Sequence, residues 1–560
     1  MQHRKTASPS QPDPGLHDGR LAGHPRIPHS RSATTMRVLA CDGIHDDGLK
    51  LFREAGWDVV VAPEPIKDAD KLAAALVDVD AVLVRSATRV PADALVQATK
   101  LKVIGRAGAG VDTIDVDAAT ARGIAVMNAP DGNTLAAAEH AIALLFSLAR
   151  HIPRADAGMK AGQWPKAGLT GFELEGKRLG VIGLGRIGGT VARKARGIGM
   201  EVAAYDPFLP ASAAGKGSVP LMTLDDLLAW ADIVTLHIPR TKETTNLLSE
   251  ARMRTMKPGA MIINAARGGL VDEAALLRLL DEGHLAGAAL DTFVTEPLQE
   301  DSPLRANPNV VLTPHLGAST SEAQQAVSTI LARQIIDFVA TGAVAGCVNL
   351  PPLTAEAALE VGPWMPLMTA LGRVASRLVP APTRLHIRYA GRTDGLDTRP
   401  LTRLLVSSLL GAASGRVTPV NALQEAGARG LEVSETIGGE GDGYDRLVRL
   451  TVEGDNAGRT VRREIDATLH RAPRVVALDG VEIEFDPLAH VLLMRNEDRP
   501  GMVGTVGSQL GAAGINIISF ALGAAGDGYA RAAITIDREI DDAQLDVLRA
   551  TSGVFSIQQV

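Results

Sequence analysis

Cysteine, aromatic side chains and long apolar runs are all scarce in this sequence. Its 560 residues include only two cysteines, Cys41 and Cys347. Two cysteines cannot form a disulfide framework, so a reducing compartment, the cytoplasm, is expected. No apolar run approaches the roughly 18 residues that cross a bilayer, which argues against a membrane partner. Because aromatic residues make up 3% of the chain, the cores must be built from Ala, Val, Leu and Ile.

An excess of positive charge is also missing. The chain has 57 Lys and Arg against 64 Asp and Glu, a net charge of −7, which argues against a nucleic-acid partner. No cluster of residues with metal-ligand spacing stands out either, so no metal is predicted. The chain is too long for a single core, and roughly three or four domains are expected.

The first segment, Met1 to Thr35, is rich in Pro, Ser, His and Arg and has no apolar periodicity. We predict that it is disordered. It lacks the apolar core of a secretory signal, although its basic character leaves organelle targeting open. An upstream start site or a dispensable tail is favoured, because Met36 opens the first strand-like run.

From Met36 onward, short apolar runs alternate with helix-length segments. This pattern predicts a parallel sheet covered by helices on both faces. A long apolar helix, Asn133 to Arg150, follows and leads toward a second series. The expected strands of the first series are Arg37–Ala40, Val59–Ala62, Ala81–Val84, Val103–Ile104 and Ile124–Met127.

The second series opens with a glycine-rich turn that predicts a dinucleotide site. A strand, Leu179–Ile182, runs into Gly183, Gly185 and Gly188 in the spacing GxGxxG, and a helix-compatible segment follows. The three glycines permit the tight turn, the approach of a pyrophosphate and close helix–strand packing. Asp206 ends the next strand, where its carboxylate can accept hydrogen bonds from the ribose and repel a 2′-phosphate. NAD is therefore predicted over NADP.

Three further stretches lie where later strands should end. They are Asn264–Gly269, Thr292–Pro297 and Thr313–Thr320, and a helix-like segment after them should return to the first domain. Ligands bind outside the carboxyl ends of strands in open α/β sheets, so these stretches should converge on the cofactor. The strands expected here are Glu201–Tyr205, Ile233–His237, Ala260–Asn264, Gly287–Leu290 and Val310–Leu312.

The residue types in these stretches suit hydride removal from a 2-hydroxy acid. His315 can serve as the general base for the hydroxyl proton. Glu296 can bind the other ring nitrogen, and the guanidinium of Arg267 can grip a carboxylate. Each residue alone has a plainer explanation: a structural histidine, a loop glutamate, a capping arginine. Their coincidence at strand ends favours catalysis.

These motifs resemble a known family. The stretches GLGRIGG, NAARGGLVDE, DTFVTEP and TPHLGAST are similar to the D-isomer-specific 2-hydroxyacid dehydrogenases, and VRSATRV and GRAGAGVDTID narrow the resemblance to the phosphoglycerate dehydrogenases. The resemblance implies Arg267, Glu296 and His315 as the catalytic set, with Asp291 holding the nicotinamide carboxamide. It also implies NAD contacts from Arg186, Ile187, Ile238, Pro239, Ala265, Ala266, Arg267, Asp291, His315, Gly317 and Ala318.

The resemblance further implies a substrate, D-3-phosphoglycerate, whose phosphate needs cations. Arg85, Arg106 and Lys166 are the candidates, although an ordinary strand-end salt bridge would also explain the two arginines. Ala109 stands where some members have Thr, and Lys166 where the family more often has Arg. The full candidate substrate set is Arg85, Ser86, Arg106, Ala109, Gly110, Asn133 and Lys166.

The last part of the chain changes character. No catalytic motif is visible from Thr354 to Pro487, which resembles the intervening domain of the longer phosphoglycerate dehydrogenases; a spacer that only builds the oligomer is the alternative. Residues 490–560 follow the order βαββαβ, which predicts a ferredoxin-like unit. It resembles an ACT domain, in which Asn496, Asp498 and Asn516 would bind L-serine, unless Asp498 only caps a helix and Asn516 only makes a turn.

The fold expected is thus α/β, with two doubly wound domains, a flavodoxin-like substrate domain and a Rossmann nucleotide-binding domain, followed by an α+β intervening domain and the ACT domain. The expected activity is NAD-dependent oxidation of D-3-phosphoglycerate at the first step of L-serine biosynthesis, in a homotetramer. The alternatives are another 2-hydroxy acid, such as glycerate or 2-hydroxyglutarate, and a non-catalytic NAD-sensing regulator. The expected boundaries are 36–133 with 317–346 (substrate), 134–316 (NAD), 347–487 (intervening) and 488–560 (ACT).

Overall fold

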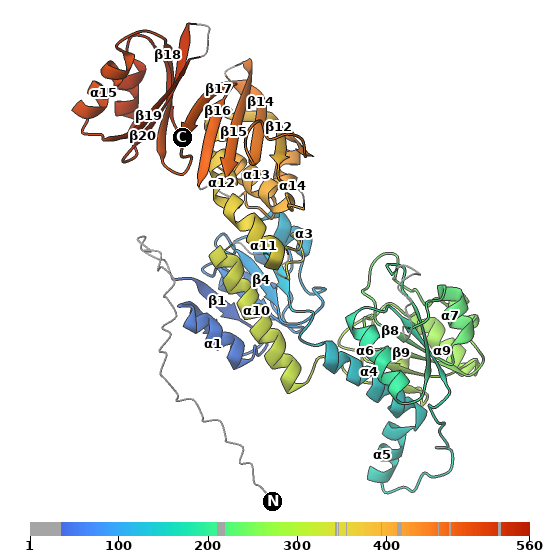
Figure 1. Ribbon diagram of the computed structural model, residues 1–560. Coiled ribbons are helices and arrows are strands. Elements are labelled where there is room, and N and C mark those ends of the chain that lie inside the picture. The colour runs from blue at the N-terminus through green and yellow to red at the C-terminus, as the bar shows by residue number, and fades with distance from the viewer. Residues whose placement is uncertain are drawn as a thin grey trace, which may run out of the picture. The chain divides into compact units, whose positions relative to one another are not determined.

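The computed structural model describes residues 35–209, 219–341, 344, 346–353, 355–393, 395–411, 417–456, 458–469, 472–524 and 528–560. The prediction for the tail, Met1 to Thr35, falls outside this part of the chain except at Thr35. Residues Met36–Val560 form one compact unit, and its elements are drawn in Figure 1.

The first sheet is parallel, with the strand order β2-β1-β3-β4-β5. This order is flavodoxin-like, as predicted, and the reversal between β1 and β3 marks the edge where ligands bind. Alternate residues face opposite sides, so α1 and α10 bury one face and α2 and α3 the other. The elements are β1 (Arg37–Ala40), α1 (Asp46–Glu54), β2 (Asp58–Val61), α2 (Ala69–Leu76), β3 (Ala81–Val84), β4 (Val103–Arg106), α3 (Val116–Ala121), β5 (Ala125–Asn128) and α10 (Ser321–Thr341).

Two segments return to this sheet from far along the chain. Helix α10 follows the last strand of the second sheet and inserts Val327, Leu331 and Ile335 into the first core. The stretch after it was predicted to begin a linker at Cys347. Instead, Cys347 bridges Met127 of the edge strand β5, so residues 346–349 lie against this sheet. The backbone groups of an open strand edge need partners, and this segment supplies them.

The second sheet is also parallel, in the order β11-β10-β9-β8-β6-β7. Helices α4 and α6 cover one face, and α7, α8 and α9 cover the other. A single bridge, Ala204 to Leu221, adds to the outer side of β7. The elements are α4 (Thr134–Ala149), α5 (Ile152–Lys160), β6 (Arg178–Ile182), α6 (Arg186–Gly197), β7 (Glu201–Tyr205), α7 (Leu224–Trp230), β8 (Ile233–Leu236), α8 (Glu250–Arg254), β9 (Ala260–Asn264), α9 (Glu273–Asp281), β10 (Leu285–Leu290) and β11 (Val310–Leu312).

The register of this sheet aligns the last residues of its strands. The final residue of each strand pairs with the final residue of its neighbour, which forms one continuous row across the sheet. Because the strands are parallel, the loops that follow the row all leave the sheet at one edge. The row consists of Tyr205, Ile182, Leu236, Asn264, Leu290 and Leu312.

The third sheet is mixed, in the order β13-β12-β14-β15-β16-β17. Helices α12 and α13 pack against one another and bury Trp364 and Tyr389 with the inner side chains of the sheet. The elements are α11 (Ala355–Val361), α12 (Met365–Leu378), β12 (Ala381–Gly391), α13 (Arg399–Gly411), α14 (Ala422–Ala428), β13 (Glu432–Ile437), β14 (Arg446–Asn456), β15 (Arg459–Leu469), β16 (Pro473–Leu478) and β17 (Val481–Phe485).

The fourth sheet is antiparallel, in the order β19-β20-β18-β21. Its elements follow the predicted βαββαβ sequence. Helix α15 begins after Gly501, its N-cap, so Asp498 does not cap this helix. The elements are β18 (His490–Glu497), α15 (Met502–Ala512), β19 (Ile517–Ala524), β20 (Tyr529–Ile536), α16 (Asp542–Arg549) and β21 (Val554–Gln559).

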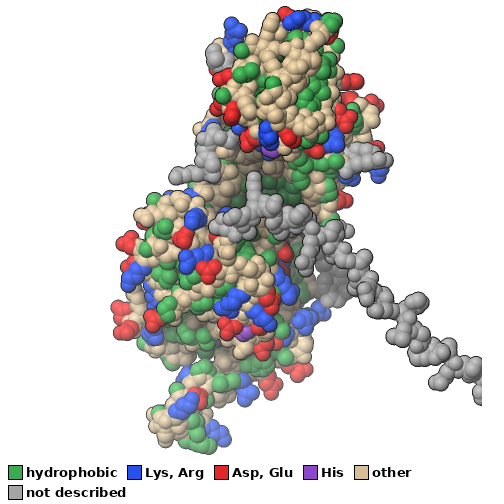
Figure 2. Space-filling view, turned by 90° about the vertical axis from the view of Figure 1, so that its left-hand side faces the viewer, with side chains coloured by type: hydrophobic (Ala, Val, Ile, Leu, Met, Phe, Trp, Pro, Cys, Tyr) green, Lys and Arg blue, Asp and Glu red, His purple; other side chains and the backbone are tan. Residues whose placement is uncertain are grey.

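Within the described part of the chain, no single helix is long and apolar enough to cross a membrane. The pair α4 and α5, bent by 67°, meets the criteria of length and composition together, and α4 is largely buried in the second core. On the face drawn in Figure 2, acidic and basic side chains are interspersed.

Candidate active site

The glycine turn after β6 has no room for a side chain where it faces the protein, but it has free space at Gly185, where a ligand could approach. Gly183 has a φ of +90°, and a Cβ there would lie 2.5 Å from Ile238 Cγ2. A Cβ on Gly188 would lie 1.9 Å from the carbonyl oxygen of Gly183, whereas Gly185 has nothing within 4 Å. The start of α6, where the first N–H groups have no partner within the helix, therefore lies beside open space at Gly185, which fits a pyrophosphate.

Asp206 lies beside this turn because it follows β7, the neighbour of β6. Its Oδ2 accepts a hydrogen bond from the Leu184 N–H at 2.9 Å, and its Oδ1 accepts one from the Phe208 N–H at 3.0 Å. These contacts fix the carboxylate next to the turn. Arg186, the first residue of α6, pairs through Nε with Asp131 Oδ1 at 2.6 Å, and both side chains are exposed. Ile187 follows it on the same helix.

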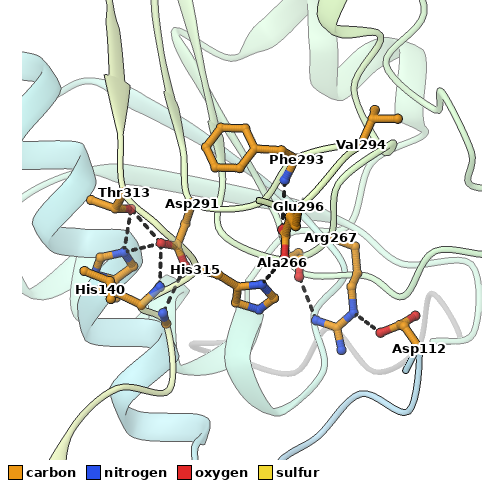
Figure 3. Close-up of polar contacts among 12 residues, drawn as sticks. Asp112, His140, Ala266, Arg267, Asp291, Phe293, Val294, Glu296, Thr313 and His315 are labelled. Atoms are coloured by element: carbon orange, nitrogen blue, oxygen red, sulfur yellow. Dashed lines mark hydrogen bonds and ion pairs between the residues drawn. The ribbon is translucent and has the colours of Figure 1, made fainter. Parts of the chain in front are cut away.

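The loops after β10 and β11 bring Glu296 and His315 together (Figure 3). His315 Nδ1 lies 2.8 Å from Glu296 Oε2, and Glu296 Oε1 accepts the Phe293 N–H at 3.0 Å. Burial would raise the pKa of Glu296, but the hydrogen bond and charge of His315 outweigh it and lower that pKa. An ionised Glu296 accepts a hydrogen bond from the Nδ1–H group of His315, so Nε2 carries no proton and is left to take one from a substrate.

Arg267 follows β9, the next strand in the row, and reaches the first sheet. Its Nη1 donates to the Ala266 carbonyl at 2.7 Å, and its Nε pairs with Asp112 Oδ2 at 2.9 Å. A Cβ on Gly110 would lie 1.9 Å from Arg267 Nη2. The glycine in the loop after β4 thus leaves the space that the guanidinium fills.

Arg106, at the end of β4, places a positive charge near Arg267, and nearby carboxylates neutralise this charge only in part. Its Nε is buried and has no hydrogen-bond partner in the described structure. Burial, together with the nearby charges of Arg267 and Arg85, lowers the pKa of Arg106 to about 10 against the opposing charges of Asp112 and Asp42. Burial also lowers the pKa of Arg85. Three neighbouring guanidinium groups with partial neutralisation suit an anionic ligand.

The other predicted substrate residues fall into two groups. Ser86 is exposed directly after Arg85, and Ala109 and Gly110 lie partly exposed in the loop after β4. Asn133 is buried at the start of α4, and its Oδ1 has no hydrogen-bond partner among the described residues. Lys166 is exposed in the loop after α5, and no described contact joins it to the arginines.

The remaining predicted cofactor residues lie along the same edge. Ile238 and Pro239 follow β8, and Ala265 and Ala266 follow β9. Asp291, directly after β10, is fully buried, and its two carboxylate oxygens accept the backbone N–H groups of Leu316 and Gly317 at 2.8 and 2.9 Å. Ala318 continues that loop. In this structure Asp291 thus holds the loop of His315, and its contact with the nicotinamide stays a prediction.

The sequence did not single out Asp112 or His140. Asp112 lies inside the motif GRAGAGVDTID, where its spacing carried no sign that it would meet Arg267. His140 is a polar residue within an apolar helix, and it lies against Asp291 and Thr313. Only the lone imidazole on a largely buried helix could have drawn attention to it.

The predicted effector residues of the fourth sheet differ in burial. Asn496, on β18, is buried, and its Oδ1 has no hydrogen-bond partner among the described residues. Asp498 and Asn516 are exposed, at the ends of loops beside Gly528 and Asp537. A buried amide oxygen without a partner is costly unless a ligand or water satisfies it.

Comparisons with known proteins agree with this geometry. Residues 142–317 match the family described as D-isomer specific 2-hydroxyacid dehydrogenase, NAD binding domain. Residues 360–479 match the D-3-phosphoglycerate dehydrogenase intervening domain, and residues 490–553 match the ACT domain. Fold and site thus define an NAD-dependent oxidoreductase of the 2-hydroxyacid dehydrogenase class.

The similar proteins narrow this class. D-3-phosphoglycerate dehydrogenase from Bacillus subtilis is 38% identical over 527 residues, 94% of this chain and 99% of the relative. The enzyme of that name from Mycobacterium leprae is 41% identical over 80% of this chain and 85% of the relative. The chain belongs to the D-3-phosphoglycerate dehydrogenase family.

Among solved structures, an NADPH-dependent glyoxylate/hydroxypyruvate reductase from Sinorhizobium meliloti is similar, with 30% identity and a TM-score of 0.51. The match covers 56% of this chain and 97% of the reductase. Apo D-lactate dehydrogenase from Escherichia coli, 28% identical, has a TM-score of 0.50 over 56% of this chain and all of that one. The predictions of the fold class, the enzyme class and NAD as the cofactor are confirmed.

Proposed function

We propose that this protein oxidises D-3-phosphoglycerate to 3-phosphohydroxypyruvate with NAD, the first step of L-serine biosynthesis. The observation that carries the proposal is the His315–Glu296 pair, 2.8 Å apart, at the edge of the sheet that also presents Arg267. The names of the relatives support the choice of substrate.

In the proposed reaction, bound NAD supplies the hydride acceptor. His315 Nε2 takes the proton of the C2 hydroxyl as the hydride leaves C2. Glu296 holds the ring in the orientation and tautomer that this step needs, and it stabilises the imidazolium that forms. Arg267 grips the carboxylate and polarises the developing carbonyl, in a position set by Asp112 and Gly110. NAD would lie along the glycine turn, with Asp206 on the ribose.

The arginines that follow β3 and end β4 support a substrate with two anionic groups. 3-Phosphoglycerate carries a phosphate as well as a carboxylate, and Arg106 and Arg85 bring charge beyond what Arg267 needs for the carboxylate. The loop N–H groups from Ala109 to Val111 would face the carboxylate, while Ser86 and Asn133 would add neutral donors. Lys166 remains a candidate only if its loop meets the substrate in another arrangement of the protein.

Two alternatives are less well supported. Glycerate and lactate carry a single carboxylate and would leave part of the arginine cluster without a charge to bind, whereas 2-hydroxyglutarate has a second carboxylate and is distinguished from 3-phosphoglycerate only by the assay. A non-catalytic NAD sensor would have no need of the pairing between His315 and Glu296. Both alternatives remain open to a direct assay.

The test is NADH formation on addition of 3-phosphoglycerate. We expect turnover with 3-phosphoglycerate and far less with glycerate, which lacks the phosphate. His315→Ala should lower turnover by about 10² to 10⁴-fold, while NADH fluorescence titration gives unchanged cofactor affinity. Equal turnover in the variant would contradict the base assignment, and no NADH from any of these acids would contradict the activity.

We propose the boundaries predicted from the sequence as the limits of the substrate, NAD, intervening and ACT domains.

We propose that L-serine binds the ACT domain at Asn496, Asp498 and Asn516 and slows turnover. The buried Oδ1 of Asn496, which has no hydrogen-bond partner among the described residues, supports a ligand at this position. A homotetramer in the cytoplasm stays a prediction.

A further inference from the structure

We propose that His140 is a positioning residue for the catalytic loop: through Asp291 and Thr313 it holds the backbone that carries His315. The proposal rests on the function proposed above. His140 belongs to α4, the helix by which the chain enters the second sheet, and it lies across that loop from His315 in Figure 3.

The contacts of His140 assign its tautomer. Its Nε2 lies 3.1 Å from Thr313 Oγ1 and 3.1 Å from Asp291 Oδ1. Thr313 Oγ1 lies 2.6 Å from Asp291 Oδ1 and has only one proton, which it donates to the carboxylate. The hydroxyl must therefore accept from His140, so Nε2 carries a proton shared between Thr313 and Asp291.

Asp291 passes this constraint to the catalytic loop. Its carboxylate accepts the N–H groups of Leu316 and Gly317, the two residues after His315. Its carbonyl oxygen accepts the His315 N–H at 2.9 Å. His315 has a φ of +55°, a left-handed conformation that is unfavourable for a residue with a Cβ. Such a conformation persists only where the surroundings impose it, and Asp291 imposes it from both sides.

Because the charged carboxylate of Asp291 is buried, each hydrogen bond that it accepts stabilises it. The side chain is fully buried, so burial would raise its pKa, but hydrogen bonds from His140, Thr313 and Leu316 outweigh burial and lower that pKa. A buried carboxylate that loses a donor is costly. Without His140, the Asp291 carboxylate would have one donor fewer. A shift of the loop or of the Asp291 side chain would let it find another donor, and either shift would displace His315.

A second contact shows that α4 and the loop are fitted to each other. A Cβ on Gly317 would lie 3.4 Å from Asp291 Oδ2 and 4.0 Å from Ala137 Cα. Ala137 and His140 are three residues apart, so they lie on the same face of α4. These are ordinary van der Waals distances, so this face of α4 packs along the catalytic loop at the place where the imidazole of His140 reaches the carboxylate.

The experiment compares His140→Ala, His140→Gln and His140→Asn by steady-state kinetics with NAD and 3-phosphoglycerate. The amide nitrogen of Gln can reach the position of Nε2, whereas that of Asn falls short. We expect kcat to fall about 10- to 100-fold in the Ala and Asn variants, with both KM values within about threefold and Gln restoring most of the turnover.

The matched control is His284→Ala. His284 is also partly buried and binds a carbonyl, that of Met253 at 3.2 Å, but it precedes β10 at the opposite edge of the same sheet. It should keep wild-type kinetics. A His140→Ala protein with wild-type kcat, or a Gln variant as impaired as the Asn variant, overturns the inference. If the wild type forms no NADH, the proposed activity fails instead. If the His140→Ala protein does not fold, the comparison of kcat between the Gln and Asn variants tests the inference.

Discussion

Arg106 carries a positive charge into a part of the molecule that is mostly closed to water. Its Nε has no partner among the described residues, and Arg85 and Arg267 repel it. An arrangement of this kind destabilises the free protein, and an anionic ligand relieves it. Active sites commonly hold such strain, so that stability and function oppose each other at these residues.

We therefore predict that Arg106→Met melts at a higher temperature than the wild type while its KM for 3-phosphoglycerate rises roughly 30-fold, as expected for a lost charged hydrogen bond. The pKa of Arg106 is lowered to about 10, so above that pH the unfolded chain holds the proton more tightly. The destabilising contribution of Arg106 should then decrease as the pH rises through about 10, which narrows the difference in melting temperature between the two proteins.

Thermal melts from pH 8 upward measure the change in stability, and substrate titrations measure the change in KM. Arg122→Met is the control, because Arg122 donates from Nε to the Leu95 carbonyl at 3.1 Å in the same domain. An Arg106→Met protein that melts lower and binds substrate normally would show that the charge is satisfied in solution.

At the scale of elements, the glycine turn shows how strand, loop and helix are fitted together. Gly188 and Gly189 are neighbours in the first turns of α6, but only Gly188 faces the backbone of the turn that follows β6. A Cβ on Gly188 meets the Gly183 carbonyl oxygen at 1.9 Å, and one on Gly189 meets only the Leu184 oxygen at 3.8 Å. Helix position alone does not distinguish the two residues, whereas packing does.

Gly188→Ala should therefore weaken NAD binding at least tenfold and lower the melting temperature, because the clash is with backbone that cannot move aside. Gly189→Ala should bind NAD as the wild type does and melt at the same or a slightly higher temperature, since Ala favours a helix by about 1 kcal/mol over Gly. NADH fluorescence titration and thermal melts of both variants measure this. Equal affinities would mean that α6 can shift away from the strand.

At the scale of the whole molecule, the proposed effector site and the cofactor site belong to different sheets. Inhibition by L-serine then requires two states of the protein that serine and substrate prefer differently. We expect L-serine to lower turnover, and Asp498→Ala to need at least tenfold more serine for the same effect. The control is Asp546→Ala, which pairs with Arg549 on α16 of the same domain. An enzyme that never responds to serine would remove the regulatory proposal.

Apolar side chains are exposed on α4, α5 and the loop after α5, and we predict that a second copy of the chain covers them. Trp164 is 79% exposed, and Met159 and Ile152 are exposed beside it in sequence. We expect light scattering to give a multiple of 58.6 kDa, and Trp164→Glu combined with Met159→Glu to halve the mass. Leu359→Glu, on α11, is the control because Leu359 is equally exposed at 80%. A wild-type monomer would contradict the prediction.

The sequence by itself determined the strands of the first two sheets, their parallel arrangement and the sheet edge at which the residues predicted to be catalytic lie. Alternating apolar runs depend on neighbours a few positions away, and parallel strands bring their carboxyl ends to one edge. Arg267, Glu296 and His315 lie in the loops that follow β9, β10 and β11, so their approach to one edge of the sheet could be inferred before any coordinates. The glycine spacing identified the cofactor for the same reason.

Only the tertiary structure decided which side chains support that edge. His140 and Thr313 are 173 positions apart, and Arg267 and Asp112 are 155 apart. No local pattern encodes such pairs, because they arise when helices and loops pack at a defined distance and angle. The partly compensated charge of Arg106 and the attachment of residues 346–349 to β5 have the same origin: burial and pairing belong to the folded chain as a whole.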